Sequence, residues 1–411
     1  MDNLTHSLVG LLAAEAVIRV RERRAPLSES SRTAIYALSI IGNNLPDLDF
    51  SYSWISGKPF GYLLQHRGYS HTLPVALLFA VLSWGGALWL VQRRGEVASR
   101  ADRWLFAGVA LMSPLLHITL DFANNYGVHP FWPFYDGWFY GDSFFILEPT
   151  FWLVILAPLT FSLRSRSIRV ALWATLAVTT GALWYRPIVP RRHAIALSLL
   201  TLALLFAARR VRPSARLVLS LTGFAFFALM FIGNSRAAKA LVRERASRAF
   251  PTEKTLDIVA TPLPANPFCW SVILVQREGE RYWVRLGRAA TFPAWLDVDA
   301  CPYDRGADPT TPLEAIDVSD GNRLRLTDEY RGSTTELAEL ARDRCEASAL
   351  LRFARVPYVT PRAANGTRII GDVRYDRHRD LDFADFRLPA RATECPKFVP
   401  PWLPPRTDLL E

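Results

Sequence analysis

Imidazole and carboxylate side chains recur at the same end of successive apolar segments of this 411-residue chain. Both groups bind divalent cations, and imidazole in particular suits zinc. Ionisable groups inside apolar segments are costly and usually mark a functional site. We therefore predict a divalent metal site at one membrane face, with the ligands His6, Asp47, His66, His71, His117 and Asp121.

The segment HRGYSHTLP carries the most specific local pattern, because two histidines flank a glycine-containing turn. Ser70 or Thr72 can cap the helix that follows this turn. Such a loop can direct both His66 and His71 toward one cation. Arg67 lies between them and is suited to bind an anionic oxygen, such as that of a phosphate. The alternative is a pair of interfacial histidines without a ligand.

His117 and Asp121 are four residues apart, so they project from one face of the predicted helix as a metal-binding pair or a hydrogen-bonded pair. Asp47 and Asp49 are two residues apart and would diverge by about 200° on a regular helix. Pro46 can break that helix. We assign Asp47 as a ligand and leave Asp49 as a second ligand, an orienting group or the general base. A simple turn at a helix end is the alternative for this LPDLD segment.

His6 starts the first apolar segment, where a lone histidine could also be a capping or interfacial group. The loop over residues 124–149 is rich in aromatic residues and lacks lysine and arginine. We interpret it as an interfacial lid over the site. The sequence leaves open whether His129, Asp142 or Glu148 of this loop joins the site.

Eight segments are apolar and roughly long enough to span a membrane. The first two are short or polar at one end, so each alone could be a buried helix of a soluble protein. The start of the chain is acidic and polar, which does not fit a cleavable signal peptide. We expect an α-helical polytopic membrane domain over residues 1–233. Its spans are 4–19, 33–50, 72–92, 104–122, 144–163, 168–185, 193–208 and 215–233.

The distribution of arginine predicts the orientation. The net charge is +10, but the arginines lie beside the apolar spans rather than on one soluble face, so we expect no nucleic-acid partner. Four loops contain 16 arginines, whereas the alternate loops contain 5 basic residues. The arginine-rich loops 19–32, 93–103, 164–169 and 209–216 then face the cytoplasm. The alternate loops 51–71, 123–143 and 186–192, the candidate ligands and both termini then lie outside it. The basic segment 234–248 by itself favours the opposite orientation, with the tail in the cytoplasm.

After residue 250 the sequence changes to short β-like runs separated by proline and glycine turns. The runs are TLDIVATPL, CWSVILVQ and RYWVRLG, with further strands expected at PYVTP and TRIIGDVRY. Ser333 and Glu336 start a helical stretch with capping chemistry. We predict a basic linker over 234–250 and a small α+β soluble domain over 251–411 with an extended or disordered proline-rich end.

All four cysteines lie in this tail and none forms a CxxC motif, which argues against a zinc ribbon. An even number of cysteines in an exported domain indicates disulfides. Three pairings are possible and the sequence does not choose among them. Free thiols in a cytoplasmic tail are the alternative. The cysteines are Cys269, Cys301, Cys345 and Cys395.

The motifs THSLVG, LPDLD, HRGYSH, HITLD and NNYG resemble in order and spacing the signature of the YdjM-like family of membrane-bound, metal-dependent hydrolases of bacteria. The resemblance covers roughly residues 1–150 and implies a hydrolase of the bacterial inner membrane without supplying its substrate. The ligand order is also similar to that of the all-helical zinc-dependent phospholipase C and nuclease group, which cleaves phosphoesters. The second HxxxD motif of that group has no counterpart here, which argues against a full three-zinc site.

We expect an integral membrane hydrolase whose six ligands hold one or two divalent ions, with zinc favoured over manganese or iron. The metal would lower the pKa of bound water, Asp49 would accept the proton and Arg67 would stabilise developing negative charge. Because the site is expected at headgroup depth, among membrane lipids, a phospholipid or lipid-linked phosphoester is the expected substrate.

Two other functions could use the same residues. A metal transporter would need polar groups along its spans, whereas cytoplasmic halves such as ALLFAVLSWGGALWL contain no ionisable residue. A non-enzymatic envelope protein would bind a partner through its disulfide-linked tail and use the histidines structurally. The sequence does not indicate an oligomeric state.

Overall fold

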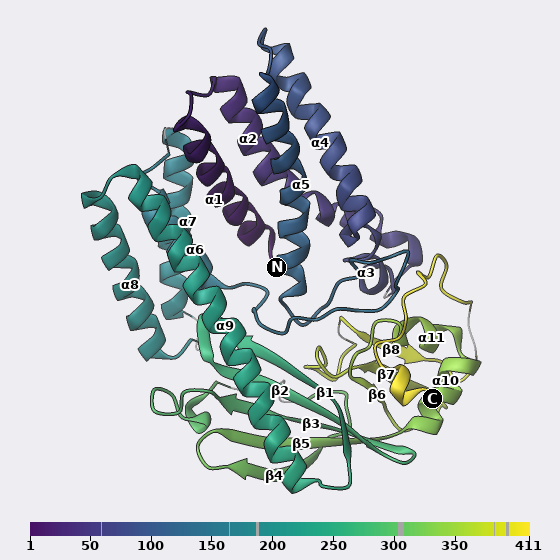
Figure 1. Cartoon of the computed structure of the whole chain (residues 1–411). Helices are drawn as coiled ribbons and strands as arrows, with labels where there is room; N and C mark the ends of the chain where they lie inside the picture. The colour runs from purple at the N-terminus through teal and green to yellow at the C-terminus, as the bar shows by residue number, and fades with distance from the viewer. Residues whose placement is uncertain (59, 164, 186–188, 303–307, 382, 392–393) are drawn as a thin grey trace.

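The computed structural model describes the whole chain except residues 59, 164, 186–188, 303–307, 382 and 392–393. A helical part is followed by a tail of two antiparallel sheets and short helices (Figure 1). This arrangement agrees with the predicted fold class of a helical membrane domain and an α+β tail.

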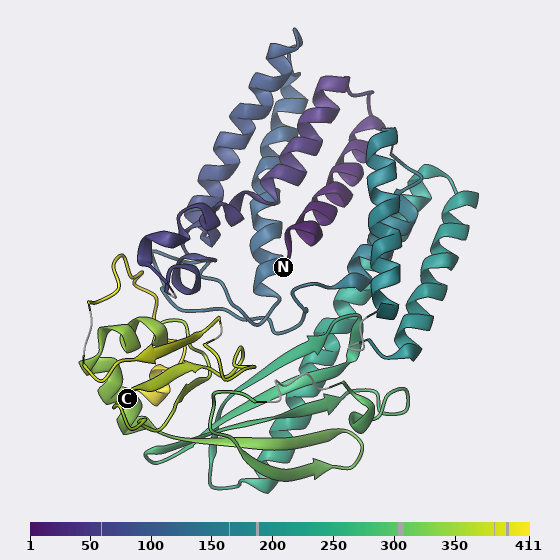
Figure 2. The ribbon, with the colours of Figure 1, turned by 180° about the vertical axis from the view of Figure 1, so that it is seen from behind.

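The helical part divides into two groups that lie next to each other (Figures 1 and 2). The first group contains α1 (Asn3–Glu22), α2 (Glu29–Gly42), α3 (Phe60–Gln65), α4 (Leu73–Arg93) and α5 (Arg100–Phe122). The second group contains α6 (Pro149–Leu159), α7 (Arg166–Tyr185), α8 (Arg191–Arg210) and α9 (Pro213–Ala249). Between α2 and α4 the chain also forms the 3₁₀ helices η1 (Leu45–Ser51), η2 (Ser53–Ser56) and η3 (Tyr69–His71).

Each predicted span overlaps a helix, although 33–50 and 144–163 extend well beyond α2 and α6. Among the described residues five helices are long and apolar enough to cross a membrane: α4, α5, α7, α8 and α9. The predicted count of eight spans is therefore not confirmed. Helix α2 has 14 residues and α6 has 11. Helix α1 includes the charged residues Glu15, Arg19 and Arg21. Most of α6 is buried by neighbouring helices, so its apolar character reflects a protein interior rather than a lipid contact.

The connections from α1 to α2, from α4 to α5 and from α8 to α9 lie at the end of the bundle away from the tail (Figure 1). These connections contain three of the four arginine-rich loops. The predicted loops 164–169 and 186–192 lie partly outside the described residues. Arginine-rich loops and the tail thus occupy opposite ends of the helical part.

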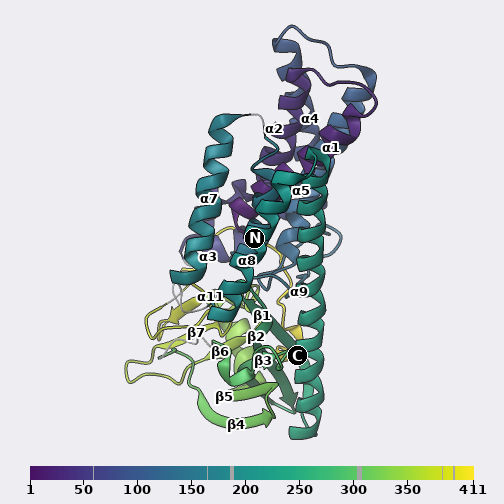
Figure 3. The same ribbon diagram turned by 90° about the vertical axis from the view of Figure 1, so that its left-hand side faces the viewer.

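Helix α9 continues from the bundle into the tail (Figure 3). It has 37 residues, so it is about 55 Å long and exceeds the hydrocarbon thickness of about 30 Å. The predicted basic linker 234–250 forms the end of this helix as far as Ala249. This end contacts β1 and β2, and its buried residues recur at helical spacing: Ser235, Ala238, Leu241, Val242 and Ala246.

The larger sheet of the tail has the antiparallel order β1-β2-β3-β5-β4. Its strands are β1 (Lys254–Leu263), β2 (Asn266–Glu278), β3 (Arg281–Ala290), β4 (Glu314–Asp320) and β5 (Leu324–Ser333), with η4 (Val298–Ala300) before β4. The smaller sheet contains β6 (Pro357–Val359), β7 (Arg368–Asp372) and β8 (Asp385–Leu388). The expected strand runs are all present.

The predicted helix after Ser333 is divided into α10 (Thr334–Asp343) and α11 (Cys345–Leu351). The hydroxyl of Ser333 accepts a hydrogen bond from the amide of Glu336, as the capping pattern predicts. The proline-rich end is extended but packed, since Trp402 is fully buried and η5 (Thr407–Leu409) follows.

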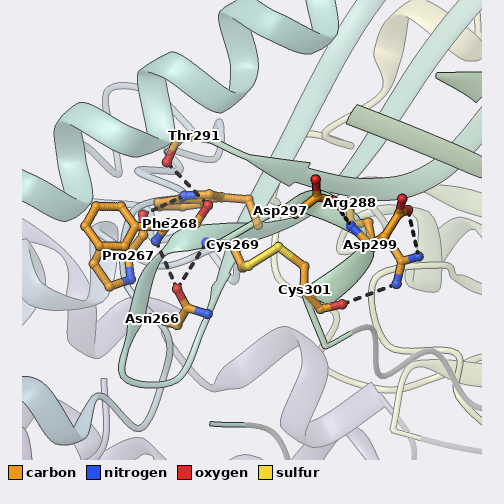
Figure 4. Close-up of a disulfide and its surroundings, with 10 residues drawn as sticks. Asn266, Pro267, Phe268, Cys269, Arg288, Thr291, Asp297, Asp299 and Cys301 are labelled. Carbon is orange, nitrogen blue, oxygen red and sulfur yellow. Dashed lines mark hydrogen bonds and ion pairs between the residues drawn. A yellow bond between two sulfur atoms is a disulfide. The ribbon is translucent and has the colours of Figure 1, made fainter. Parts of the chain in front are cut away.

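All four cysteines form disulfides, which resolves the pairing that the sequence left open. Cys269 in β2 is bonded to Cys301 just after η4 (Figure 4). The carbonyl of Cys301 accepts a hydrogen bond of 3.2 Å from Arg288 on β3. The second disulfide connects Cys345 at the start of α11 to Cys395 in the C-terminal segment. The two bridges fix loops onto both halves of the tail.

The tail contacts the helical part at the end opposite the arginine-rich connections (Figures 1 and 3). The indole of Trp402 donates a hydrogen bond of 2.9 Å to the carbonyl of Leu64 at the end of α3. From the helical part to the tail, the indole of Trp138 donates a hydrogen bond of 2.7 Å to the carbonyl of Arg352. The tail is therefore docked on the bundle rather than separate from it.

Candidate metal centre

The predicted ligands meet where several elements of the first helix group begin or end. Helix α1 begins three residues before His6, and its start is capped by Asp2, which accepts a hydrogen bond of 2.9 Å from the amide of Thr5. Helix α5 ends one residue after Asp121. The 3₁₀ helices η1 and η3 supply the intervening ligands. The alternating direction of the helices thus brings distant motifs to one end of the bundle.

Four of the six predicted ligands surround one point: Asp47, His71, His117 and Asp121. The Nε2 atoms of His71 and His117 are 3.0 Å apart, and they lie 3.1 and 3.4 Å from Oδ2 of Asp121. The Oδ1 atom of Asp47 is 3.5 Å from Nε2 of His117 and 3.7 Å from Nε2 of His71.

These distances fit a four-coordinate divalent ion. Ligand atoms about 2.0–2.1 Å from a tetrahedral zinc lie about 3.3 Å from one another. The donor–donor distances of 3.0 to 3.7 Å bracket that value. The side chains of His71, His117 and Asp121 have no exposed surface, and that of Asp47 is 8% exposed. Two imidazoles and two carboxylates facing one another are a donor set that suits zinc, manganese or iron.

Hydrogen bonds on the far side of each ring orient both ligand histidines. Nδ1 of His117 donates a hydrogen bond of 2.8 Å to the carbonyl of Asn43. Nδ1 of His71 lies 3.0 Å from the hydroxyl of Ser70 and 3.3 Å from Oδ2 of Asp49. The proton is therefore held at Nδ1 and the Nε2 lone pair points into the cluster. Burial lowers the pKa of His71 to about 3 against the opposing effect of Asp49, so this ring is neutral and able to bind a cation.

Asp49 acts as an orienting group in this arrangement, one of the three roles that the sequence left open. Its Oδ1 lies 3.0 Å from Nδ1 of His66. Its Oδ2 accepts hydrogen bonds from the amide of Arg67 and the hydroxyl of Ser70, at 2.8 and 2.9 Å, and also faces His71. Because these donors occupy both oxygens, Asp49 has little capacity left to accept a proton from water.

An Asp49→Asn substitution should therefore weaken metal binding by about 10–100-fold while leaving the four ligands in place. The amide keeps the shape of the carboxylate but loses the charge that holds the proton at Nδ1 of His71. Zinc affinity measured by chelator competition on detergent-purified protein tests this expectation. An affinity equal to that of the wild type would show that Asp49 does not orient His71.

His6 and His66 lie at the edges of the cluster rather than at its centre. Nε2 of His6 is 3.2 Å from Oδ1 of Asp121, and its ring stacks on that of His117 with centroids 3.8 Å apart. His66 forms a second possible ligand group with Asp47 and Asp49. The structure thus brings all six predicted ligands together, four around one point and two beside it.

Arg67 is buried against the ligand Asp121. Its Nε lies 3.0 Å from Oδ2 of that residue, and its Nη1 donates a hydrogen bond of 2.7 Å to Oδ1 of Asn124. It adopts a positive φ of 57°, a backbone conformation that turns the chain sharply between the two histidines of HRGYSH. The amino group of Met1 also contacts Asp121. Asn124 lies in the NNYG motif, but its residue type alone did not indicate this contact with Arg67.

The three undecided residues of the loop before α6 contact the tail and other parts of the chain instead of the cluster. Asp142 pairs with Arg355 of the tail at 2.7 and 2.8 Å. Glu148 caps α6 and also accepts a hydrogen bond of 3.2 Å from the amide of Ala265. The ring of His129 stacks on that of Trp402 with centroids 4.0 Å apart. The loop that we interpreted as a lid thus connects the bundle to the tail.

A comparison with protein families supports the motif-based resemblance. The model of a family described as YdjM inner membrane protein matches residues 1–191. No curated protein and no solved structure was found to match the chain. The matched region contains all six ligands, Arg67 and the orienting Asp49, and it ends at the first residue of α8. Residues 1–191, and with them the candidate metal centre, are therefore similar to the family described as YdjM inner membrane protein.

Proposed function

We propose that this protein is a membrane-embedded, metal-dependent hydrolase that acts on a phospholipid or lipid-linked phosphoester. The observation that carries this proposal is the buried group of Asp47, His71, His117 and Asp121, whose donor atoms converge at distances suited to one divalent ion. When bound, such an ion would lower the pKa of a water molecule and polarise the bond to be cleaved. Zinc is the favoured metal.

The four donors are not equivalent, which suits a catalytic rather than a structural site. His71, His117 and Asp121 approach one another within 3.4 Å, whereas Asp47 is 3.5 and 3.7 Å from the two rings. Catalytic zinc sites use three protein ligands and keep a further position open. Oδ2 of Asp47 also accepts a hydrogen bond of 2.8 Å from the exposed Asn3. Because Asp47 is the most distant of the four donors, we propose that it leaves the ion to the other three and takes the proton from water, a role that we first gave to Asp49.

The depth of the centre supports a lipid substrate. Helix α4 begins two residues after His71, and α5 ends one residue after Asp121. Both helices are long and apolar enough to cross a membrane. The centre then lies at the headgroup level, where the phosphoester of a lipid is also found. Arg67 supplies a positive charge next to the centre, suited to phosphate oxygens.

Two independent features support placing the centre and the tail outside the cytoplasm of a bacterium. The connections rich in arginine lie at the opposite end of the bundle, and such loops face the cytoplasm. The tail contains two disulfides, which persist in oxidising compartments. The basic end of α9 by itself favours the opposite orientation, but large domains are translocated largely regardless of such charge.

Phosphate release from phosphatidic acid and from phosphorylated prenyl lipids tests the proposed activity. Wild-type protein purified in detergent and supplied with zinc or manganese should show turnover that a chelator removes. His71→Ala should reduce that turnover by about 100-fold or more, because it deletes a direct ligand. His193→Ala is the matched control, since His193 lies beside Phe268 and Trp295 rather than in the cluster. Equal rates for the wild type and His71→Ala would refute the assignment.

A further inference from the structure

The tail covers the metal centre on the side facing away from the bundle. Trp402 is fully buried, bonded to the carbonyl of Leu64 and packed against Tyr69, with ring centroids 4.9 Å apart. Tyr126, which follows the metal-site helix α5, packs against Phe353 of the tail at 5.0 Å. A molecule approaching from the aqueous side along the axis of the bundle therefore meets the tail first.

The exposure of the candidate ligands rises on one side. The side chains of His6, His71, His117 and Asp121 have no exposed surface. Asp47 is 8% exposed and His66 is 7% exposed. Asp47 belongs to η1, and His66 contacts Phe50 of η1. Among the candidate ligands, those with any exposed side-chain surface therefore lie at η1.

The surface around η1 is apolar. Leu48, Phe50 and Trp54 are 54%, 46% and 75% exposed. The ring of Phe50 stacks on that of His66, with centroids 4.5 Å apart, so the exposed aromatic surface leads directly to a candidate ligand. Large exposed apolar groups at the level where apolar helices end are typical of a contact with the membrane interface.

Polar groups lie just inside this apolar surface. The exposed Asn3 donates hydrogen bonds to Oδ2 of Asp47, at 2.8 Å, and to Oδ1 of Asn44, at 3.2 Å. Asn44 in turn donates one of 3.1 Å to the hydroxyl of Ser7. An amphiphile could thus keep its chains on the apolar residues while its polar head replaces these hydrogen bonds. The apolar residues outside thus correspond to the chains of a membrane lipid, and the polar residues inside correspond to its head.

We propose that the substrate reaches the centre sideways from the membrane, through an η1 mouth formed by Asn3, Asp47, Leu48, Phe50, Trp54 and His66. This inference rests on the proposed function and narrows its substrate to an amphiphile with an anionic head and at least one long apolar chain. The head passes Asn3 and Asp47 to the buried donors. The chain remains against Leu48, Phe50 and Trp54. A water-soluble phosphoester lacks the part that this surface binds.

Site-specific labelling tests whether the mouth faces lipid. All four natural cysteines are in disulfides, so a Leu48→Cys variant carries one free thiol for a fluorescent label. In vesicles of phosphatidylglycerol and phosphatidylcholine, lipids with a spin label near the headgroup should quench this fluorophore by about half or more. Glu280→Cys, in the exposed turn between β2 and β3, is the control and should be quenched little. Quenching of the Leu48 label by aqueous iodide alone would overturn the proposal.

A kinetic comparison tests the chain-binding role independently. Trp54→Ala should raise KM for long-chain phosphatidic acid about tenfold more than KM for a short-chain, water-soluble phosphatidic acid, with kcat for the long-chain lipid unchanged. Equal effects on both substrates would contradict the mouth. Failure of the wild type to hydrolyse either substrate would refute the proposed function, whereas the labelling result would still decide whether the mouth faces lipid.

Discussion

Purified His71→Ala and Asp121→Ala variants should each contain less than about a tenth of the metal that the wild type binds. Nε2 of His71 lies 3.1 Å from Oδ2 of Asp121, and both atoms face the same point as His117. Deleting either side chain removes one of the three closest donors. The two remaining donors then stay buried without the third ligand. Since loss of an outer hydrogen-bond partner alone costs about 10–100-fold in affinity, loss of a direct ligand should cost more.

Inductively coupled plasma mass spectrometry on detergent-purified protein measures the bound metal directly. The wild type should carry about one equivalent of zinc after supplementation. A second equivalent would indicate that Asp47, Asp49 and His66 also bind an ion. His193→Ala, outside the cluster, should retain full metal content. A wild type without metal, or variants that retain it, would assign the histidines a structural role.

The sequence was sufficient to predict which residues meet at the centre. Polar groups that recur at one end of consecutive apolar helices must face the same side, because successive helices run in opposite directions. The i,i+4 spacing of His117 and Asp121 placed both on one helix face, and both contribute to the cluster. Residue types and spacing thus contain most of the information about the ligand set.

The division of roles among these residues could not be predicted from spacing. Asp49 turns toward His66 and His71 because Pro46 begins a 3₁₀ turn and Arg67 reverses the chain with a positive φ. Neither feature follows from a regular helix, so the sequence left the role of Asp49 open and could not show its contacts with His66 and His71. The burial of α6 could not be predicted from its own sequence either, because it depends on helices that follow it in the chain.

Strand positions in the tail were predictable from local alternation, whereas the docking of the tail was not. Residues such as Asp142 and Arg355 are 213 positions apart, and nothing in their local sequence connects them. The expectation that the loop before α6 is a lid was reasonable from its aromatic composition. The structure instead places Trp138 and His129 of that loop against the tail.

Replacing Arg355 by alanine should destabilise the docked tail by about 3 kcal/mol, because it removes two hydrogen bonds and one of the two counter-charges of the buried Asp142, leaving Lys239 at 2.6 Å as the other. Arg355 donates hydrogen bonds of 2.7 and 2.8 Å to Asp142 and one of 2.7 Å to Asp257. The side chains of Arg355 and Asp142 are 4% and 0% exposed. Burial alone would raise the pKa of Asp257, but the charge of Arg355 holds that pKa well below its usual range. Asp257 has a second counter-charge in Arg406, at 3.6 Å, so the loss of Arg355 weakens its pairing without removing it.

Thermal unfolding in detergent, followed by the fluorescence of the tail tryptophans, should show a midpoint lowered by about 10 °C in Arg355→Ala. Arg248→Ala is the matched control, because its ion pair with Glu244 is exposed on both sides and should leave the midpoint nearly unchanged. Limited proteolysis should release the tail faster from Arg355→Ala than from the control. If both variants behaved alike, the buried pair would not hold the tail against the bundle, and the docking would rest on other contacts such as those of Trp402 and Trp138.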